Sequence, residues 1–156
     1  ETSNDEPLPD VEDVIIEKTV TIKNVNYTVV AVGAYSFDCR EEVKSVIIPN
    51  SVKTLRENAF FCASIDWIVI PDSVTKIEDS ALDGLYFVDI FCEAKSQPTT
   101  WPSEWCSSLS NVYWKDQWEY DSNNKPVVKN KWFFSHIKSI FYKRSVFCSV
   151  FDKYHS

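Results

Sequence analysis

The sequence predicts a solenoid, in which short repeats stack on one another and each adds one strand to a parallel sheet. The first observation is a set of three segments that share apolar or small residues in the same columns and begin at Thr28, Ser51 and Ser73, at steps of 23 and 22 residues. The second is a set of β-prone runs, VKSVIIP, IDWIVIP and FVDIFCE, which alternate with those segments and recur every 22 residues. One strand and one return segment bury little alone, so the repeats must stack.

The chain divides into three regions. Residues 1–12 are predicted to be a disordered acidic linker, because the opening ETSNDEPLPD holds a single leucine and buries too little apolar surface to offset the entropy of ordering. Residues 13–128 are predicted to be the repeat domain with its caps. Residues 129–156 form a separate basic and aromatic tail.

A β-hairpin is predicted at the front of the repeats. Residues 14–32 are rich in Val, Ile and Thr, and a polar break at residues 23–26 separates two β-prone runs. This hairpin would cap the N-terminal end of the solenoid.

Each predicted strand directs alternate side chains to opposite faces of the sheet. The side chains expected to point into the core are Val43, Val46 and Ile48, then Ile65, Ile68 and Ile70, and finally Phe87, Ile90 and Cys92. The side chains expected on the other face are Ser45, Ile47, Trp67, Val69, Asp89 and Phe91. Pro49 and Pro71 close the first two strands, where a missing N–H group costs least.

The return segments supply the rest of the core. Their apolar columns are Val32, Leu55 and Ile77, followed by Phe37, Phe60 and Leu82. Written as one pattern, strand and return segment read V-x-x-V-x-I-P-x-S-V-x-x-L-x-x-x-A-F-x-C, which resembles the BspA-type leucine-rich repeat. The resemblance covers about residues 28–128, because the segments from Ile90 and Asn111 are similar to the terminal cap of such arrays in bacterial surface proteins.

The resemblance implies a leucine-rich-repeat solenoid of α/β horseshoe-like shape, with about three repeats, a parallel sheet on the concave face and a mostly irregular convex side. It also implies a secreted or cell-surface location, a role in adhesion or host-protein binding, and no catalysis or cofactor. Three repeats are near the minimum that stacking sustains, so the array is expected to be part of a longer one.

The concave face is the predicted binding surface. Trp67 and Phe91 flank Val69 and Ile47 across neighbouring strands, and exposed apolar patches of this kind often mark an interaction site. Ligand contacts are assigned to Ser45, Ile47, Trp67, Val69, Asp89 and Phe91, with a protein or a glycan as the partner. The alternative is that the cap or the tail covers this face, and the repeats are then a structural spacer without a ligand.

Four tryptophans gather in the predicted C-terminal cap, namely Trp101, Trp105, Trp114 and Trp118. Indoles can stack on sugar rings, but the favoured interpretation is that they seal the exposed end of the core.

The five cysteines contain no CxxC spacing, which argues against a zinc site. Cys39 and Cys62 fall in one column, with Gly84 at the third position, and are expected to be buried and unreactive. A disulfide between them stays open as an alternative.

Composition excludes several functions. The first 124 residues hold 22 acidic and 9 basic residues, a balance of −13, which repels nucleic acid. Only two glycines occur, too few for the usual phosphate-binding loops. Both histidines, His136 and His155, lie in the tail, so no histidine-based catalytic or metal site is expected in the repeats. An N-x-T sequence at Asn26 matters only in a glycosylating host.

The tail has apolar residues at the spacing of one helical face, at Phe133, Ile137, Ile140, Phe147 and Phe151. Lysines and an arginine lie among them, so a helix here would suit an anionic lipid surface, a partner's groove or the acidic repeats themselves. Membrane contact is the less favoured of these. The sequence leaves the oligomeric state open.

Overall fold

The computed structural model describes residues 12–129, so the predictions for the linker and the tail lie outside the described residues. The elements in chain order are β1 (Asp13–Ile15), β2 (Thr19–Ile22), β3 (Val25–Thr28), β4 (Ala31–Val32), β5 (Ser45–Ile47), β6 (Thr54–Leu55), β7 (Trp67–Ile70), β8 (Lys76–Ile77), β9 (Asp89–Cys92), β10 (Asn111–Tyr113), the 3-10 helix η1 (Lys115–Gln117), β11 (Trp118–Tyr120) and β12 (Pro126–Val128).

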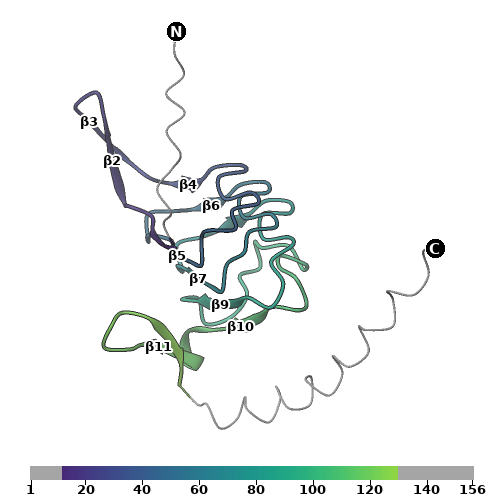
Figure 1. The fold of residues 1–156 in the computed structure, drawn as a ribbon. Helices are drawn as coiled ribbons and strands as arrows, with labels where there is room; N and C mark the ends of the chain where they lie inside the picture. Colours follow the sequence, from purple (N-terminus) through teal and green to yellow (C-terminus); the bar gives the residue numbers. More distant parts are fainter. Residues whose placement is uncertain (1–11, 130–156) are drawn as a thin grey trace, which may run out of the picture.

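The predicted solenoid is confirmed. A parallel sheet of five strands runs in the order β1-β5-β7-β9-β10, and a parallel sheet of three short strands runs β4-β6-β8. The chain passes from one sheet to the other in each coil, and the coils stack side by side (Figure 1). The larger sheet has two more strands than the three that the repeat predicts, because β1 precedes the first recognised repeat and β10 follows the last.

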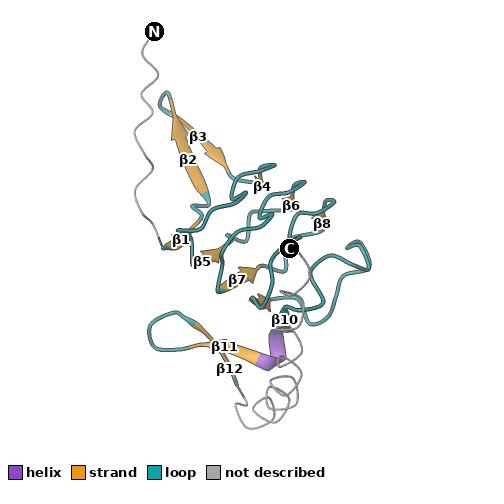
Figure 2. Ribbon diagram, turned by 45° about the vertical axis from the view of Figure 1, so that its right-hand side comes forward, coloured by secondary structure: helices purple, strands orange, loops and turns teal. Residues whose placement is uncertain are grey.

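The N-terminal hairpin consists of β2 and β3, with Ile22 opposite Val25. Its turn residues Lys23 and Asn24 have φ angles of 50° and 62°, as a two-residue turn with positive φ at both central positions requires. The hairpin is inserted between β1 and β4, and it projects beyond the stacked coils (Figure 2). The hairpin prediction is therefore confirmed for β2 and β3 but wrong for β1, which pairs with β5 in the main sheet.

The core lies between the two sheets, and the columns of the return segments form it as predicted. Val32, Leu55 and Ile77 are buried, and the rings of Phe37 and Phe60 stack with centroids 4.8 Å apart. Hydroxyl groups connect adjacent coils as well, since Ser51 Oγ donates to the carbonyl of Val29 at 2.7 Å and thus repeats the role of Ser73 toward Val52.

Two turns in each coil use left-handed backbone. The first falls at Tyr35, Asn58 and Ser80, and the second at Cys39, Cys62 and Gly84, all with φ between 51° and 74°. The second turn directs both cysteine side chains outward. The expectation that Cys39 and Cys62 are buried is therefore wrong, because both are exposed, and no disulfide joins them.

One inward position in the last repeat also differs from the prediction. Phe87 is 77% exposed, whereas the equivalent Val43 and Ile65 are buried. Its φ of 63° turns the side chain away from the core, and Leu85 and Val88 are buried beside it instead.

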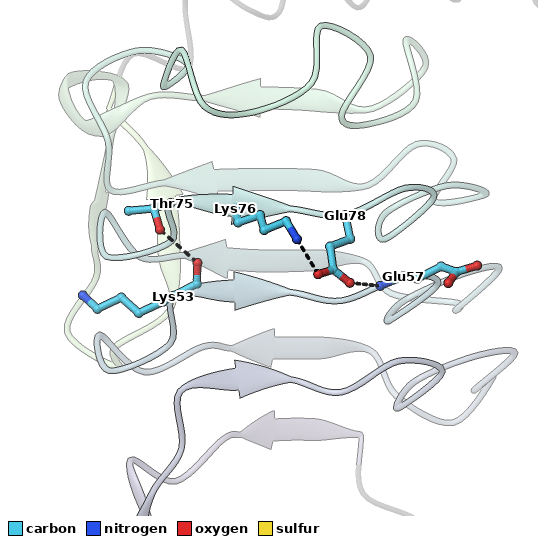
Figure 3. Close-up of polar contacts among 5 residues, drawn as sticks. All are labelled: Lys53, Glu57, Thr75, Lys76 and Glu78. Carbon is cyan, nitrogen blue, oxygen red and sulfur yellow. Dashed lines mark hydrogen bonds and ion pairs between the residues drawn. The ribbon is translucent and has the colours of Figure 1, made fainter.

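Polar contacts join adjacent coils along the three-stranded sheet (Figure 3). Lys76 Nζ lies 2.8 Å from Glu78 Oε1, and the second carboxylate oxygen of Glu78 accepts a hydrogen bond from the backbone N–H of Glu57 at 3.2 Å. The hydrogen bond and charge of Lys76 lower the pKa of Glu78. The carboxylate of Glu78 thus holds its coil against the preceding one through the bond to Glu57.

The C-terminal end of the core is sealed by the cap tryptophans, as predicted for three of the four. Trp101 and Trp105 are buried with ring centroids 4.8 Å apart, and Trp114 packs on both. The indole of Trp101 donates a 3.0 Å hydrogen bond to the carbonyl of Val74, so the cap is fixed to the last complete coil. Trp118 instead covers the outward face of the larger sheet.

Candidate binding surface

The face of the five-stranded sheet that points away from the core is here called the outer sheet face. The strand register places its side chains in two rows that run across the strands. The polar row is Asp13, Ser45, Trp67, Asp89 and Asn111. The apolar row is Ile15, Ile47, Val69, Phe91 and Tyr113. Neighbours within a row lie about 4.8 Å apart, because that is the spacing of paired strands.

The polar row is fixed by its own hydrogen bonds. Ser45 Oγ donates to Asp13 Oδ1, and Asn111 Nδ2 donates to Asp89 Oδ1 at 2.7 Å. Trp67 lies between these two pairs and is partly buried. The row thus presents an indole at its centre with one carboxylate toward each end.

Tyr113 connects the two rows. Burial is the main reason that its pKa is raised to about 12, and the charge of Asp89 and a hydrogen bond to that carboxylate raise it further. The phenol therefore stays protonated at neutral pH and donates to Asp89, so that two donors hold this carboxylate.

The apolar row is covered at its C-terminal end. Val69, Phe91 and Tyr113 are buried together with Trp118, which the hairpin of β11 and β12 lays over them. The rings of Phe91 and Tyr113 stack at 5.2 Å, and Trp118 packs on Phe91 at 5.5 Å. At the other end of the row, Ile15 is 67% exposed.

All six residues predicted to bind a ligand lie on this face, but they do not form one exposed patch. Ile47, Trp67 and Asp89 are partly exposed, whereas Ser45, Val69 and Phe91 are buried. The expectation of an exposed surface is wrong for these last three, because Ser45 sits between neighbouring side chains of its row and the cap covers the other two.

Four further residues belong to the outer sheet face and were missed, namely Asp13, Ile15, Asn111 and Tyr113. The first two lie on β1, which the sequence interpretation assigned to the hairpin. A signal for the third was present, because Asn111 follows Asp89 by 22 residues, the length of the repeat.

A hollow lies between the turns of the last repeat and the cap. It has a volume of about 370 Å³ and is lined by Glu78, Asp79, Ser80, Asp83, Pro102, Glu104 and Trp105. Its carboxylates form no metal site of three ligands, since no group of three potential metal-ligating side chains occurs among residues 12–129.

Comparison with known proteins identifies the repeats. Residues 10–101 match the BspA type leucine rich repeat region in six copies, a stretch that includes β1 and ends at the first cap tryptophan. No curated protein and no solved structure matches the chain. None of the helices in the part that the structure describes has the length and apolar character needed to cross a membrane.

BspA-type repeats are typical of bacterial surface proteins. The match covers more than half of the chain and coincides with the stacked coils. The chain belongs to the BspA-type leucine-rich repeat family.

Proposed function

We propose that this chain is a non-catalytic interaction module of a surface or secreted protein, and that it binds a protein or a glycan through the outer sheet face. The observation that carries the proposal is the position of Trp67, a partly exposed indole at the centre of a rigid sheet. Large aromatic side chains dominate the binding energy of many interfaces, and a sheet orders them in advance at little entropic cost.

The cap restricts where the partner binds. Because the hairpin of β11 and β12 covers Phe91 and Val69, the available surface is centred on Trp67 and extends over Ile47 toward Ile15. The contact residues of the proposal are therefore Ile15, Ile47 and Trp67, with the carboxylates of Asp13 and Asp89 at its sides.

A structural spacer without a ligand is the second candidate. The burial of Val69 and Phe91 favours it, because a cap that packs on the sheet serves the fold and reduces the area available to a partner.

The test is a binding screen of the purified chain against extracellular host proteins and a glycan array. We expect any specific signal to fall at least about tenfold for Trp67→Ala, because truncating a central aromatic side chain commonly costs more than 1.4 kcal/mol of binding free energy. Phe87→Ala is the matched control, since Phe87 is an exposed aromatic residue outside this face.

Folding is checked separately by the thermal unfolding of each variant. Ile15→Asp provides a second probe, because Ile15 is largely exposed and its replacement leaves the core unchanged. Binding that survives both changes would exclude this face, whereas the absence of any specific signal from the parent chain would favour the spacer.

A further inference from the structure

The polar row of the outer sheet face offers a ligand more hydrogen-bond acceptors than donors. The hydroxyl of Ser45 is used as a donor to Asp13, and an amide hydrogen of Asn111 is used toward Asp89. What remains for a ligand is mostly acceptor capacity, because a carboxylate has about four lone-pair sites and each of these two still has free ones.

The excess of hydrogen-bond acceptors over donors favours some classes of ligand over others. A sugar hydroxyl both donates and accepts, so a glycan site usually offers both kinds of partner. An arginine guanidinium carries five N–H donors and no acceptor, and a lysine ammonium carries three. A surface that offers mainly acceptors fits the donor-only group.

The acidic charge of this region also favours a basic ligand. Residues 12–129 carry 18 acidic and 11 basic side chains, a balance of −7. The ion pairs within this region are Arg40 with Glu42, Lys76 with Glu78 and Lys115 with Glu93, so neither carboxylate of the polar row has a basic partner there. The neighbouring Lys44 directs its ammonium group to the carbonyl of Glu41 at 2.7 Å.

The indole between the carboxylates supplies the third element. A guanidinium that lies flat on Trp67 gains a cation–π contact, and its N–H groups then extend toward Asp89 on the next strand, about 4.8 Å away. Arginine suits this position better than lysine, because its planar group stacks on the ring and contacts a carboxylate with two hydrogen bonds.

We propose that the partner of the outer sheet face is a basic protein segment in extended conformation, with one arginine between Trp67 and Asp89 and a second basic residue at Asp13. The inference rests on the proposed function and narrows it to one ligand class. The carboxylates lie three strands apart, about 14 Å, which an extended chain spans with four residues at about 3.4 Å each. The expected motif is therefore Arg-x-x-x-Arg.

The experiment titrates the full chain, labelled with nitrogen-15, with short peptides and follows the indole N–H signals of its tryptophans. The probe is acetyl-Arg-Ser-Thr-Ser-Arg-amide. Its controls are the same peptide with citrulline for arginine, which keeps the shape without the charge, and acetyl-Arg-Arg-Ser-Thr-Ser-amide, which keeps the charge and changes the spacing. Trp67→Phe assigns the signal, and the hydrogen-bonded indoles of Trp101 and Trp118 serve as internal references.

We expect the Trp67 signal to shift with the first peptide, to stay fixed with citrulline, and to respond about tenfold more weakly to the adjacent arginines. Asp89→Asn and Asp13→Asn should each weaken binding severalfold and keep an acceptor for their partners. Asp72→Asn changes the net charge equally at an exposed turn and should bind like the parent chain.

The remaining outcomes separate this inference from the proposed function. Equal shifts with arginine and citrulline, or equal losses for Asp72→Asn and Asp89→Asn, would overturn the basic partner. A Trp67 shift with the neutral sugar maltohexaose but not with the arginine peptide would also overturn it, and would leave the binding face intact as a glycan site. If the arginine peptides, maltohexaose and the wider protein and glycan screen all leave Trp67 unchanged, both the basic partner and the binding function fail.

Discussion

The indole nitrogen of Trp118 donates a 2.9 Å hydrogen bond to the backbone carbonyl of Cys92, and this bond fixes the β11–β12 hairpin over the outer sheet face. The same ring packs on Phe91 and has the ammonium group of Lys115 at 5.2 Å from its centroid. Trp118 is only 2% exposed, so its contribution combines burial with a buried hydrogen bond.

We expect Trp118→Ala to lower the free energy of unfolding by about 3–5 kcal/mol, the range for deleting a large buried aromatic side chain. Trp118→Phe keeps most of the packing and loses the hydrogen bond, so its cost should be about 1–2 kcal/mol. Urea unfolding followed by circular dichroism measures both. Equal costs would mean that the ring contributes little beyond its hydrogen bond.

A Cβ atom at Gly84 would lie 2.9 Å from Cys62 Sγ and 3.0 Å from the backbone nitrogen of Cys62, in a turn where φ is 74°. Gly84→Ala should therefore destabilise the fold by about 1–2 kcal/mol. It should still fold, because Cys62 occupies the same column with φ of 53°. Gly33→Ala is the control, since its nearest neighbour is the hydroxyl oxygen of Ser36 and its φ is not positive. A larger loss at Gly33 would contradict this account.

Much of the solenoid could be predicted from the sequence because its core is periodic. Leu55 and Ile77 occupy equivalent places 22 residues apart, and stacking requires the same chemistry in each coil. The strand β1 was missed because the inserted hairpin breaks this period. Asp13 precedes its neighbour Ser45 by 32 residues, whereas Asn111 follows Asp89 by 22.

The remaining features could not be predicted because they depend on local backbone conformation and on the packing of the cap. The exposure of Phe87, Cys39 and Cys62 follows from left-handed φ angles. Gly84 in the column of the two cysteines was a signal for their turn, whereas no glycine marks the position of Phe87. The burial of Val69 and Phe91 depends on a contact with Trp118, which lies outside the repeat and follows no period. Apart from Phe87, the alternation of side chains assigned the faces correctly, but it carries no information about what covers a face.

The exposed Cys39 provides a chemical test of its turn. Its Sγ lies 3.4 Å from Asp38 Oδ1, and the hydrogen bond to this carboxylate is the main cause that raises the pKa of the thiol, with burial and the carboxylate charge adding to it. Alkylation requires the thiolate, so Asp38→Asn should speed the reaction of Cys39 with iodoacetamide at neutral pH. Peptide mass analysis over time gives the rate at each cysteine. Cys92 is the internal reference, because burial raises its pKa and blocks the reagent until the protein unfolds. An unchanged rate at Cys39 would exclude control by Asp38.

Alkaline pH should weaken the contact between the phenol of Tyr113 and Asp89 and so destabilise the fold. The folded-state pKa of Tyr113 is raised to about 12, whereas an unfolded tyrosine titrates near about 10. The stabilisation from this group is therefore complete below about pH 10 and is lost as the pH rises toward about 12, because the unfolded chain ionises first.

Tyr113→Phe removes this titration and the hydrogen bond to Asp89. At neutral pH the variant should be less stable by about 1 kcal/mol, and the difference from the parent chain should shrink between about pH 10 and pH 12. Urea unfolding of both proteins across this range measures the difference. Burial raises the pKa of Cys106 to about 11, but that thiol is common to both chains and cancels in the comparison. A difference that stays constant with pH would show that the phenol of Tyr113 titrates alike in the folded and unfolded chain.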